Sequence, residues 1–288
     1  LIDAREACAV TEKTKPPLAV VGGVPPSSES LEFRNATVLD GSGRDPFRAH
    51  VHVADGRIRR VETDLSNPAG ADRVVDLDGA HLAPGFVDMH AHSELRLLEK
   101  PGAVEKLTQG VTTEVLGQDG VSVAPIPERL KSEWASRIEP LDGSLDESWP
   151  WVTVGRYLDE LGSVDPAVNV AYYAPHGNLR SIVAEFEDRE LTDWEVETLQ
   201  SELAGTIDAG AFGLSTGMIY PPSSYGRDDE LEALAAVLGR RKSFMVSHVW
   251  NETDEVVGSI ERFVGICRSG GCHAHVSHLK VGGQQNWG

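Results

Sequence analysis

The stretch Pro84-Gly85-Phe86-Val87-Asp88-Met89-His90-Ala91-His92 decides how this chain is organised. A short apolar run ends in two histidines separated by one residue, and in a β-strand the side chains at i and i+2 point to the same face. Both imidazoles are therefore expected on one face of a strand, which suits a metal ion. The polar pair Ser93-Glu94 follows, so we predict that the strand ends here, where α/β barrels hold their chemistry.

The same spacing occurs twice more, at His50-Val51-His52 and at His273-Ala274-His275. Both pairs lie among alternating residues without a Gly or Pro stop beside them. We interpret them as ordinary strand histidines that pack within their sheets, so only the pair in the opening stretch supplies candidate ligands.

The composition is that of a folded globular protein, and its net charge disfavours binding to polyanions. The chain has 288 residues, of which 40% are hydrophobic and 25% charged, and a folded chain of this size buries about three quarters of its unfolded surface. Its 45 acidic against 26 basic residues give a formal net charge of −19. Nucleic acids and anionic membranes attract positive charge, so neither is an expected partner.

The cysteines and the hydropathy indicate a cytoplasmic protein. Cys8, Cys267 and Cys272 form no Cys-x-x-Cys pair and leave one thiol unpartnered, so a disulfide framework is not expected. No apolar run approaches the roughly 18 residues of a membrane span, and residues 1–30 lack a signal pattern. The first residue is Leu1 rather than Met, so we expect an upstream piece in the parent protein.

Three regions follow one another along the chain. Residues 1–30 are dense in Pro, Gly and Ser and are expected to form a flexible leader. Residues 31–83 contain short β-like runs separated by Asp-Gly turns, which predicts a small β-sandwich-like module, the N-terminal part of a composite domain. Residues 84–288 alternate strand and helix.

The alternating region predicts an α/β fold. We expect strands at 85–92, 111–116, 168–174, 211–216, 244–248 and 273–278. Helices are expected at 103–109, 152–161, 194–209, 230–241 and 252–269, with Thr192 beginning a capped helix. Such alternation gives a parallel sheet covered by helices. Six βα units are visible where a closed (β/α)8 barrel of the TIM type has eight, so we expect a partial barrel in a chain truncated at its C-terminus.

Candidate ligands collect at the carboxyl ends of the expected strands. They are His90, His92, Asp119, His176, His248 and His278. These ends converge at one mouth of a barrel. Imidazoles and a carboxylate suit zinc or a similar divalent ion, which lowers the pKa of bound water and polarises a carbonyl oxygen. The residues therefore predict metal-assisted hydrolysis.

The order of several motifs resembles the amidohydrolase superfamily and, within it, the N-acyl-D-amino-acid deacylases, also called D-aminoacylases. The matching segments cover most of residues 31–288 and are 84–92, 109–113, 117–120, 176–180, 213–222 and 276–280. The resemblance implies a hydrolase that cleaves the linear amide C–N bond of N-acyl amino acids of the D series by metal-activated water. It implies one or two Zn²⁺ ions and a small-molecule substrate, and it leaves the oligomeric state open.

The resemblance also implies roles for individual residues. The His90–His92 pair matches the metal ligands of the first strand, and His248 and His278 match ligands of the tightly held zinc. Lys280 matches a basic residue that receives the substrate carboxylate. We interpret His176 as hydrogen-bonding within its loop, with a role in shaping the pocket as the alternative.

Three features depart from the family pattern. Asp119 stands where the family commonly has a Cys zinc ligand, and a carboxylate oxygen also binds zinc, at about 2.0–2.2 Å against about 2.3 Å for sulfur. After His248 the family usually has a basic residue, whereas this chain reads Val249-Trp250-Asn251-Glu252, which is expected to alter substrate recognition. The family's general acid/base, an Asp on the eighth strand, has no counterpart here, so no catalytic residue is assigned.

Two alternatives stay open at this point. A cyclic amidase of the hydantoinase or dihydroorotase kind bridges two metals through a modified Lys at the end of the fourth strand, and residues 211–216 contain no Lys. The other alternative is an inactive truncated fragment, which lacks the Asp of the eighth strand.

Overall fold

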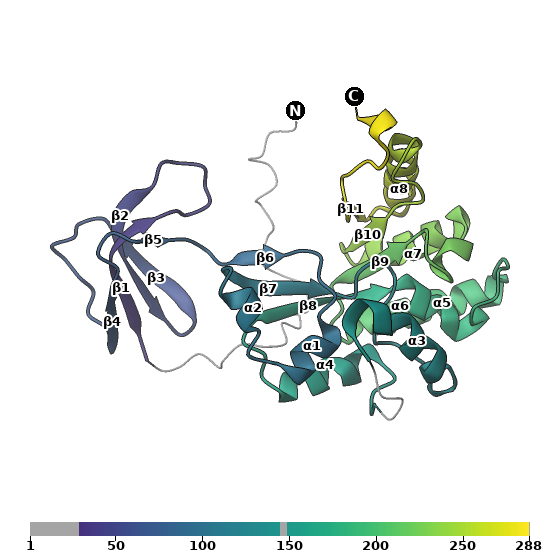
Figure 1. Cartoon of the computed structure of the whole chain (residues 1–288), viewed down its shortest axis with the longest axis horizontal. Coiled ribbons are helices and arrows are strands. Elements are labelled where there is room, and N and C mark those ends of the chain that lie inside the picture. Colours follow the sequence, from purple (N-terminus) through teal and green to yellow (C-terminus); the bar gives the residue numbers. More distant parts are fainter. Residues whose placement is uncertain (1–28, 145–148, 288) are drawn as a thin grey trace.

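The computed structural model describes residues 29–144 and 149–287, so nearly all of the expected leader lies outside the described residues. Two separate sheets organise this part of the chain (Figure 1). The first sheet precedes the His90–His92 segment in sequence, and the second begins with the strand that leads into it.

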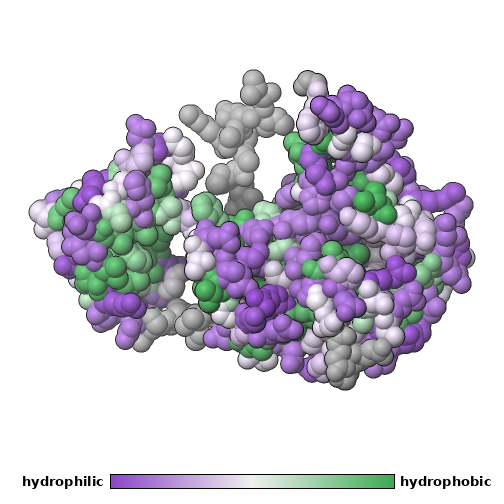
Figure 2. Space-filling view, in the orientation of Figure 1, coloured by the Kyte–Doolittle hydropathy of each residue, from purple (hydrophilic) through white to green (hydrophobic). Residues whose placement is uncertain are grey.

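The first sheet is mixed. Its strands are β1 (Leu31–Val38), β2 (Phe47–Ala54), β3 (Arg57–Glu62), β4 (Arg73–Asp76) and β5 (His81–Leu82). β1 pairs antiparallel with β2 and β2 with β3, whereas β4 and β5 run parallel to β1. Asp55 and Gly56 both have positive φ between β2 and β3, as the expected Asp-Gly hairpin turn requires. The apolar surface over this sheet in Figure 2 agrees with exposed Ile58, Val61 and Val74.

The second sheet is parallel throughout and curls into a half-barrel. Its strand order is β11-β10-β9-β8-β7-β6. The strands are β6 (Phe86–Asp88), β7 (Val111–Leu116), β8 (Asn169–Pro175), β9 (Gly213–Gly217), β10 (Phe244–His248) and β11 (His273–Val276). The strand predictions at 111–116 and 244–248 match β7 and β10 residue for residue. The expected partial α/β barrel is therefore confirmed.

Helices follow the strands and cover the sheet (Figure 1). They are α1 (Glu94–Glu99), α2 (Val104–Leu107), α3 (Lys131–Asp142), α4 (Val154–Ser163), α5 (His176–Ala184), α6 (Asp193–Asp208), α7 (Asp228–Arg240) and α8 (Val256–Gly270). Apolar residues of α6 and α7 belong to the main core, among them Leu199, Leu203, Leu234 and Leu238. Within residues 29–144 and 149–287, no helix has both the length and the apolar character of a membrane span.

Three of these helices were not predicted from sequence, and each lacks a strong helical pattern. α1 is six residues long, and α3 contains Pro140. α5 begins at His176 directly after β8, and most of its residues are buried, so no polar face marks it. Burial on all sides hides the periodicity by which an amphipathic helix is recognised.

Two strands end earlier than the sequence predicts. β6 stops at Asp88, whose Oδ1 accepts a hydrogen bond from the backbone N–H of His90 at 3.2 Å and turns the chain. β11 stops at Val276, two residues before His278. The argument that His90 and His92 share one face of a strand is therefore wrong, because both lie in the loop beyond it.

The predicted cap of α6 forms a complete capping box. Thr192 Oγ1 accepts from the N–H of Glu195 at 3.3 Å, and Glu195 Oε2 accepts from the N–H of Thr192 at 2.8 Å. We expect Thr192→Ala to lower the free energy of unfolding by about 1 kcal/mol, because one helix N–H loses its acceptor. Urea denaturation measures this difference. Thr198→Ala, on the exposed face of the same helix, is the control and should not destabilise the protein; equal stability of both variants would contradict the role of the cap.

Candidate metal centre

The end of β10 and the loops that follow β6, β7 and β11 bring the five predicted ligands together. Two groups of potential ligand atoms form, each with its atoms within 4.8 Å of one another. The first group is His90, His92 and Asp119, and the second is Asp119, His248 and His278. Asp119 belongs to both groups, so its carboxylate lies at the centre of the cluster.

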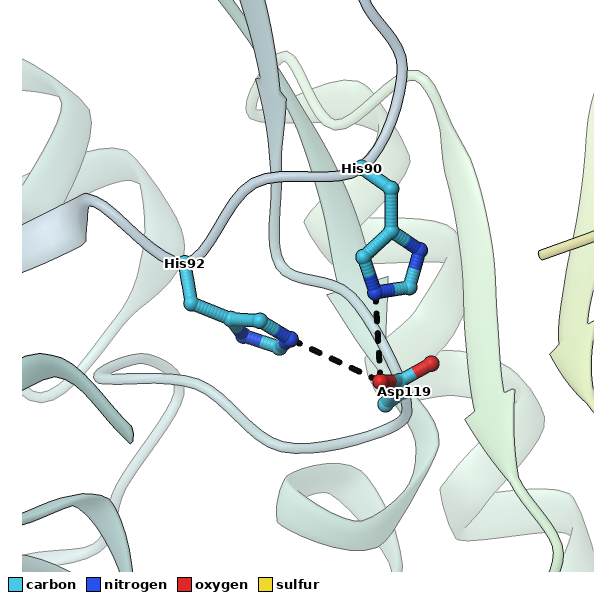
Figure 3. A group of neighbouring side chains, drawn as sticks. All are labelled: His90, His92 and Asp119. Atoms are coloured by element: carbon cyan, nitrogen blue, oxygen red, sulfur yellow. Dashed lines mark hydrogen bonds and ion pairs between the residues drawn. The ribbon is translucent and has the colours of Figure 1, made fainter. Parts of the chain in front are cut away.

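Each oxygen of Asp119 faces a different pair of histidines. Oδ2 lies 3.2 Å from Nε2 of His90 and 3.5 Å from Nε2 of His92, as Figure 3 shows. Oδ1 lies 3.7 Å from Nε2 of His278 and 3.9 Å from Nδ1 of His248. The rings of His90 and His278 are themselves close, with centroids 4.4 Å apart. The two histidine pairs therefore surround a single carboxylate.

The backbone around Asp119 is held in an uncommon conformation. Asp119 has φ 54°, in the left-handed region that Asp tolerates better than most residues. Its carbonyl oxygen packs against Gly217 of β9, where an added Cβ would lie 2.0 Å from that oxygen. A side chain at position 217 would therefore displace the turn that carries Asp119.

Two buried residues that sequence reasoning missed hold the same turn. Glu94 Oε1 accepts hydrogen bonds from Gly117 N at 2.9 Å and from Ser122 Oγ at 2.7 Å. Ser215 Oγ accepts from Gly120 N at 3.1 Å and donates to the carbonyl of Gly117. The polar pair Ser93-Glu94 directly after His92 was the available signal for Glu94, whereas Ser215 contacts the turn only in the tertiary structure.

The charges on Asp119, His248 and His278 favour metal binding, whereas burial of His92 is outweighed by its hydrogen bond to Asp119 and by the charge of Glu94, which together raise its pKa. Burial alone would raise the pKa of Asp119, but hydrogen bonds from His90 and His92 outweigh it and hold the pKa well below its usual range. The carboxylate is therefore ionised at neutral pH. Burial lowers the pKa of His248 and of His278, which leaves both imidazoles neutral. A neutral imidazole and an ionised carboxylate are the forms that bind a metal ion.

The donor set fits zinc. Asp119 Oδ1 and both ring nitrogens of His248 are buried, and none of these atoms makes a hydrogen bond with any other described residue. Buried polar atoms without partners are costly unless another group satisfies them. Nitrogen and oxygen donors at a mouth of the barrel suit Zn²⁺, which binds His and Asp in proteins.

Lys280 lies at the edge of the cluster. Its Nζ is 2.8 Å from Glu252 Oε2, and the same oxygen is 3.3 Å from Nε2 of His248. The predicted substrate-binding lysine is thus separated from a predicted ligand by one carboxylate.

Other histidines lie outside the cluster. His176 is buried, and its Nε2 is 2.7 Å from Glu230 Oε1. Glu230 Oε2 is also 3.3 Å from Nε of the buried Arg180, which supports the structural interpretation of His176. The His273 ring packs at a tilt against that of Phe244, with ring centroids 4.9 Å apart, in keeping with a packing role.

A second carboxyl group lies behind His92. Asp142, together with Glu94 and His92, lines a small pocket, and burial and the charge of Glu94 raise the pKa of Asp142 to about 7. Between its ordinary pKa and about 7, the folded state holds this proton more tightly than the unfolded state does. The stability contributed at this position therefore falls as pH rises through that window.

We expect Asp142→Asn to remove this pH dependence in the metal-free protein. The variant should be more stable than the parent at pH 8 and should differ less from it at pH 5. Urea denaturation at the two pH values measures the effect, and Asp159→Asn on the exposed face of α4 is the control. The assignment would be contradicted if the parent protein became more stable relative to Asp142→Asn between pH 5 and pH 8.

Comparisons with known proteins agree with this fold. Residues 73–286 match the amidohydrolase family. The chain is 35% identical to the N-acyl-D-glutamate deacylase of Alcaligenes xylosoxydans xylosoxydans over 258 residues, which are 90% of this chain and 51% of that protein. It is 34% identical to the D-aminoacylase of the same organism, over 90% of this chain and 52% of that protein.

A solved structure shows the same relationship. The N-acyl-D-glutamate deacylase of Bordetella bronchiseptica, complexed with zinc and a phosphonate inhibitor, superimposes with a TM-score of 0.80 at 36% identity, covering 90% of this chain and 53% of that one. The chain thus spans about half the length of these relatives. The family match covers most of its residues, and the chain belongs to the amidohydrolase family.

Proposed function

We propose that this protein is a zinc-dependent hydrolase that cleaves the linear amide bond of N-acyl-D-amino acids. The observation that carries the proposal is Asp119, whose two oxygens face two histidine pairs at one mouth of a half-barrel. The similarity to N-acyl-D-glutamate deacylase and D-aminoacylase supports both the reaction and the D series.

The residues have separate roles in this proposal. The zinc ligands are His90, His92, Asp119, His248 and His278. When bound, one or two Zn²⁺ ions polarise the acyl carbonyl and lower the pKa of a water molecule. Lys280 receives the carboxylate of the substrate and so orients the amide beside the metal centre. The Tyr220 ring contacts that of His248, with ring centroids 5.1 Å apart.

A linear amide is favoured over a cyclic one. The cyclic amidases bridge their metals with a Lys at the end of the fourth strand, and β9 of this chain has the sequence Gly213-Leu214-Ser215-Thr216-Gly217. Ser215 is instead committed to the turn that carries Asp119. β9 therefore offers no Lys to bridge two metal ions.

The proposal includes a small-molecule substrate and a cytoplasmic location, without nucleic-acid or membrane partners. The formal net charge of −19 disfavours binding to polyanions. Cys267 and Cys272 are free thiols, as is usual in a reducing compartment.

Removing the shared carboxylate should weaken zinc binding. We expect Asp119→Ala to lower the zinc affinity by more than about tenfold, because both ligand groups lose a member. Asp119→Cys should recover much of that affinity, since a thiolate also binds zinc. Competition with a chromophoric chelator measures the affinity. His273→Ala, which removes a histidine outside the cluster, is the control, and unchanged affinity in Asp119→Ala would exclude Asp119 as a ligand.

The reaction itself is tested with zinc-loaded protein. We expect release of free amine from N-acetyl-D-glutamate, N-acetyl-D-aspartate or N-acetyl-D-methionine, no comparable release from the L enantiomers, and loss of activity on chelation. A hydantoin serves as the cyclic competitor, and His90→Ala is the inactive control. Failure to hydrolyse any N-acetyl-D-amino acid, or faster hydrolysis of the hydantoin, would reject the proposed function.

A further inference from the structure

Glu252 lies between two parts of the candidate site that have separate roles. It is in the loop between β10 and α8, and its side chain is only 14% exposed. Its Oε2 is 3.3 Å from Nε2 of His248 and 2.8 Å from Nζ of Lys280. One carboxylate oxygen therefore contacts both a proposed zinc ligand and the proposed receptor of the substrate carboxylate.

Glu252 Oε2 lies at ion-pair distance from Nε2 of His248, without the geometry of a hydrogen bond, and its charge acts on the two ring nitrogens unequally. Nδ1 faces Asp119, 3.9 Å from its Oδ1, whereas Nε2 faces Glu252. A neutral imidazole carries one proton, and the negative charge of Glu252 favours that proton on Nε2. The lone pair of Nδ1 then points into the cluster. Carboxylates next to metal-binding histidines commonly fix the tautomer and the ring orientation in this way.

The contact with Lys280 restrains a side chain that would otherwise be free. Lys280 is 59% exposed, in the segment after β11, and a lysine side chain is long and flexible. Glu252 holds this segment at two points, because its carbonyl oxygen also accepts a hydrogen bond from Gly282 N at 2.7 Å. The ammonium group has three donors, so Lys280 can bind a substrate carboxylate while keeping its contact with Glu252.

We propose that Glu252 is a positioning residue that couples the metal centre to recognition of the substrate carboxylate. It orients His248 toward the metal and holds Lys280 at a defined distance from it. This inference rests on the proposed deacylase function. Loss of the Glu252 side chain is expected to weaken both zinc binding and recognition of the substrate carboxylate. Glu252 itself binds neither the metal nor the substrate.

Zinc affinity tests the first half of the proposal without any catalysis. We compare the parent chain with Glu252→Ala and Glu252→Gln by competition with a chromophoric chelator. Glu252→Ala should bind zinc about tenfold more weakly, which is the usual cost of losing such a partner. Glu252→Gln retains an oxygen acceptor but not the charge, so its affinity should be intermediate. Glu261→Gln, exposed on neighbouring α8, is the matched control and should bind zinc as the parent does.

Substrate recognition tests the second half, with all variants saturated with zinc. Glu252→Ala should raise the KM for an N-acetyl-D-amino acid about tenfold but leave the KM for its uncharged C-terminal amide nearly unchanged, because only the acid uses Lys280. The double variant with Lys280→Met should match Lys280→Met alone. A purely structural role of Glu252 predicts equal increases in KM for the acid and for the amide.

The outcomes separate this inference from the proposed function. Unchanged zinc affinity in Glu252→Ala, or equal effects on acid and amide substrates, would overturn the positioning role. If the parent protein hydrolyses no N-acyl amino acid, the proposed function fails, and the zinc titration still decides whether Glu252 orients His248.

Discussion

The shared carboxylate of Asp119 is the interaction on which the candidate site depends. Four imidazoles from the ends of β6, β10 and β11 lie around its two oxygens. Without this negative charge, the four imidazoles would lose the carboxylate that lies within 3.2 to 3.9 Å of a nitrogen of each ring. The contacts with His90 and His92 in turn keep the carboxylate ionised despite its burial.

The surrounding fold explains how the turn that carries Asp119 is held among the histidines. Asp119 has its left-handed φ in a turn that is held by hydrogen bonds from Gly117 N to Glu94 and from Gly120 N to Ser215, two residues that are distant in sequence. Gly217 allows the backbone of β9 to approach the Asp119 carbonyl. Three separate segments of the chain therefore fix the position of the carboxylate. Glu252 extends the same arrangement outward, from His248 to Lys280.

Sequence patterns predicted the architecture well where local rules dominate. The alternation of apolar runs and helical stretches identified β7 and β10 residue for residue, and the Thr192 capping box formed as expected. The patterns failed where burial removes polarity contrast, as in α5, or where a side chain turns the chain, as Asp88 does after β6. His90 and His92 were predicted as ligands and lie beside Asp119, although the strand geometry used to argue for them does not occur.

The sequence by itself determined the strand–helix alternation, the family membership and the identity of the residues at the mouth of the half-barrel, because these depend on local composition and on the order of short motifs. Only the tertiary structure decided that Asp119 is shared by both histidine pairs and that Glu94 and Ser215 hold its turn. It also decided that Glu252 joins His248 to Lys280. These contacts depend on how successive parallel strands lie beside one another, and residues far apart in the chain carry no local signal of that proximity.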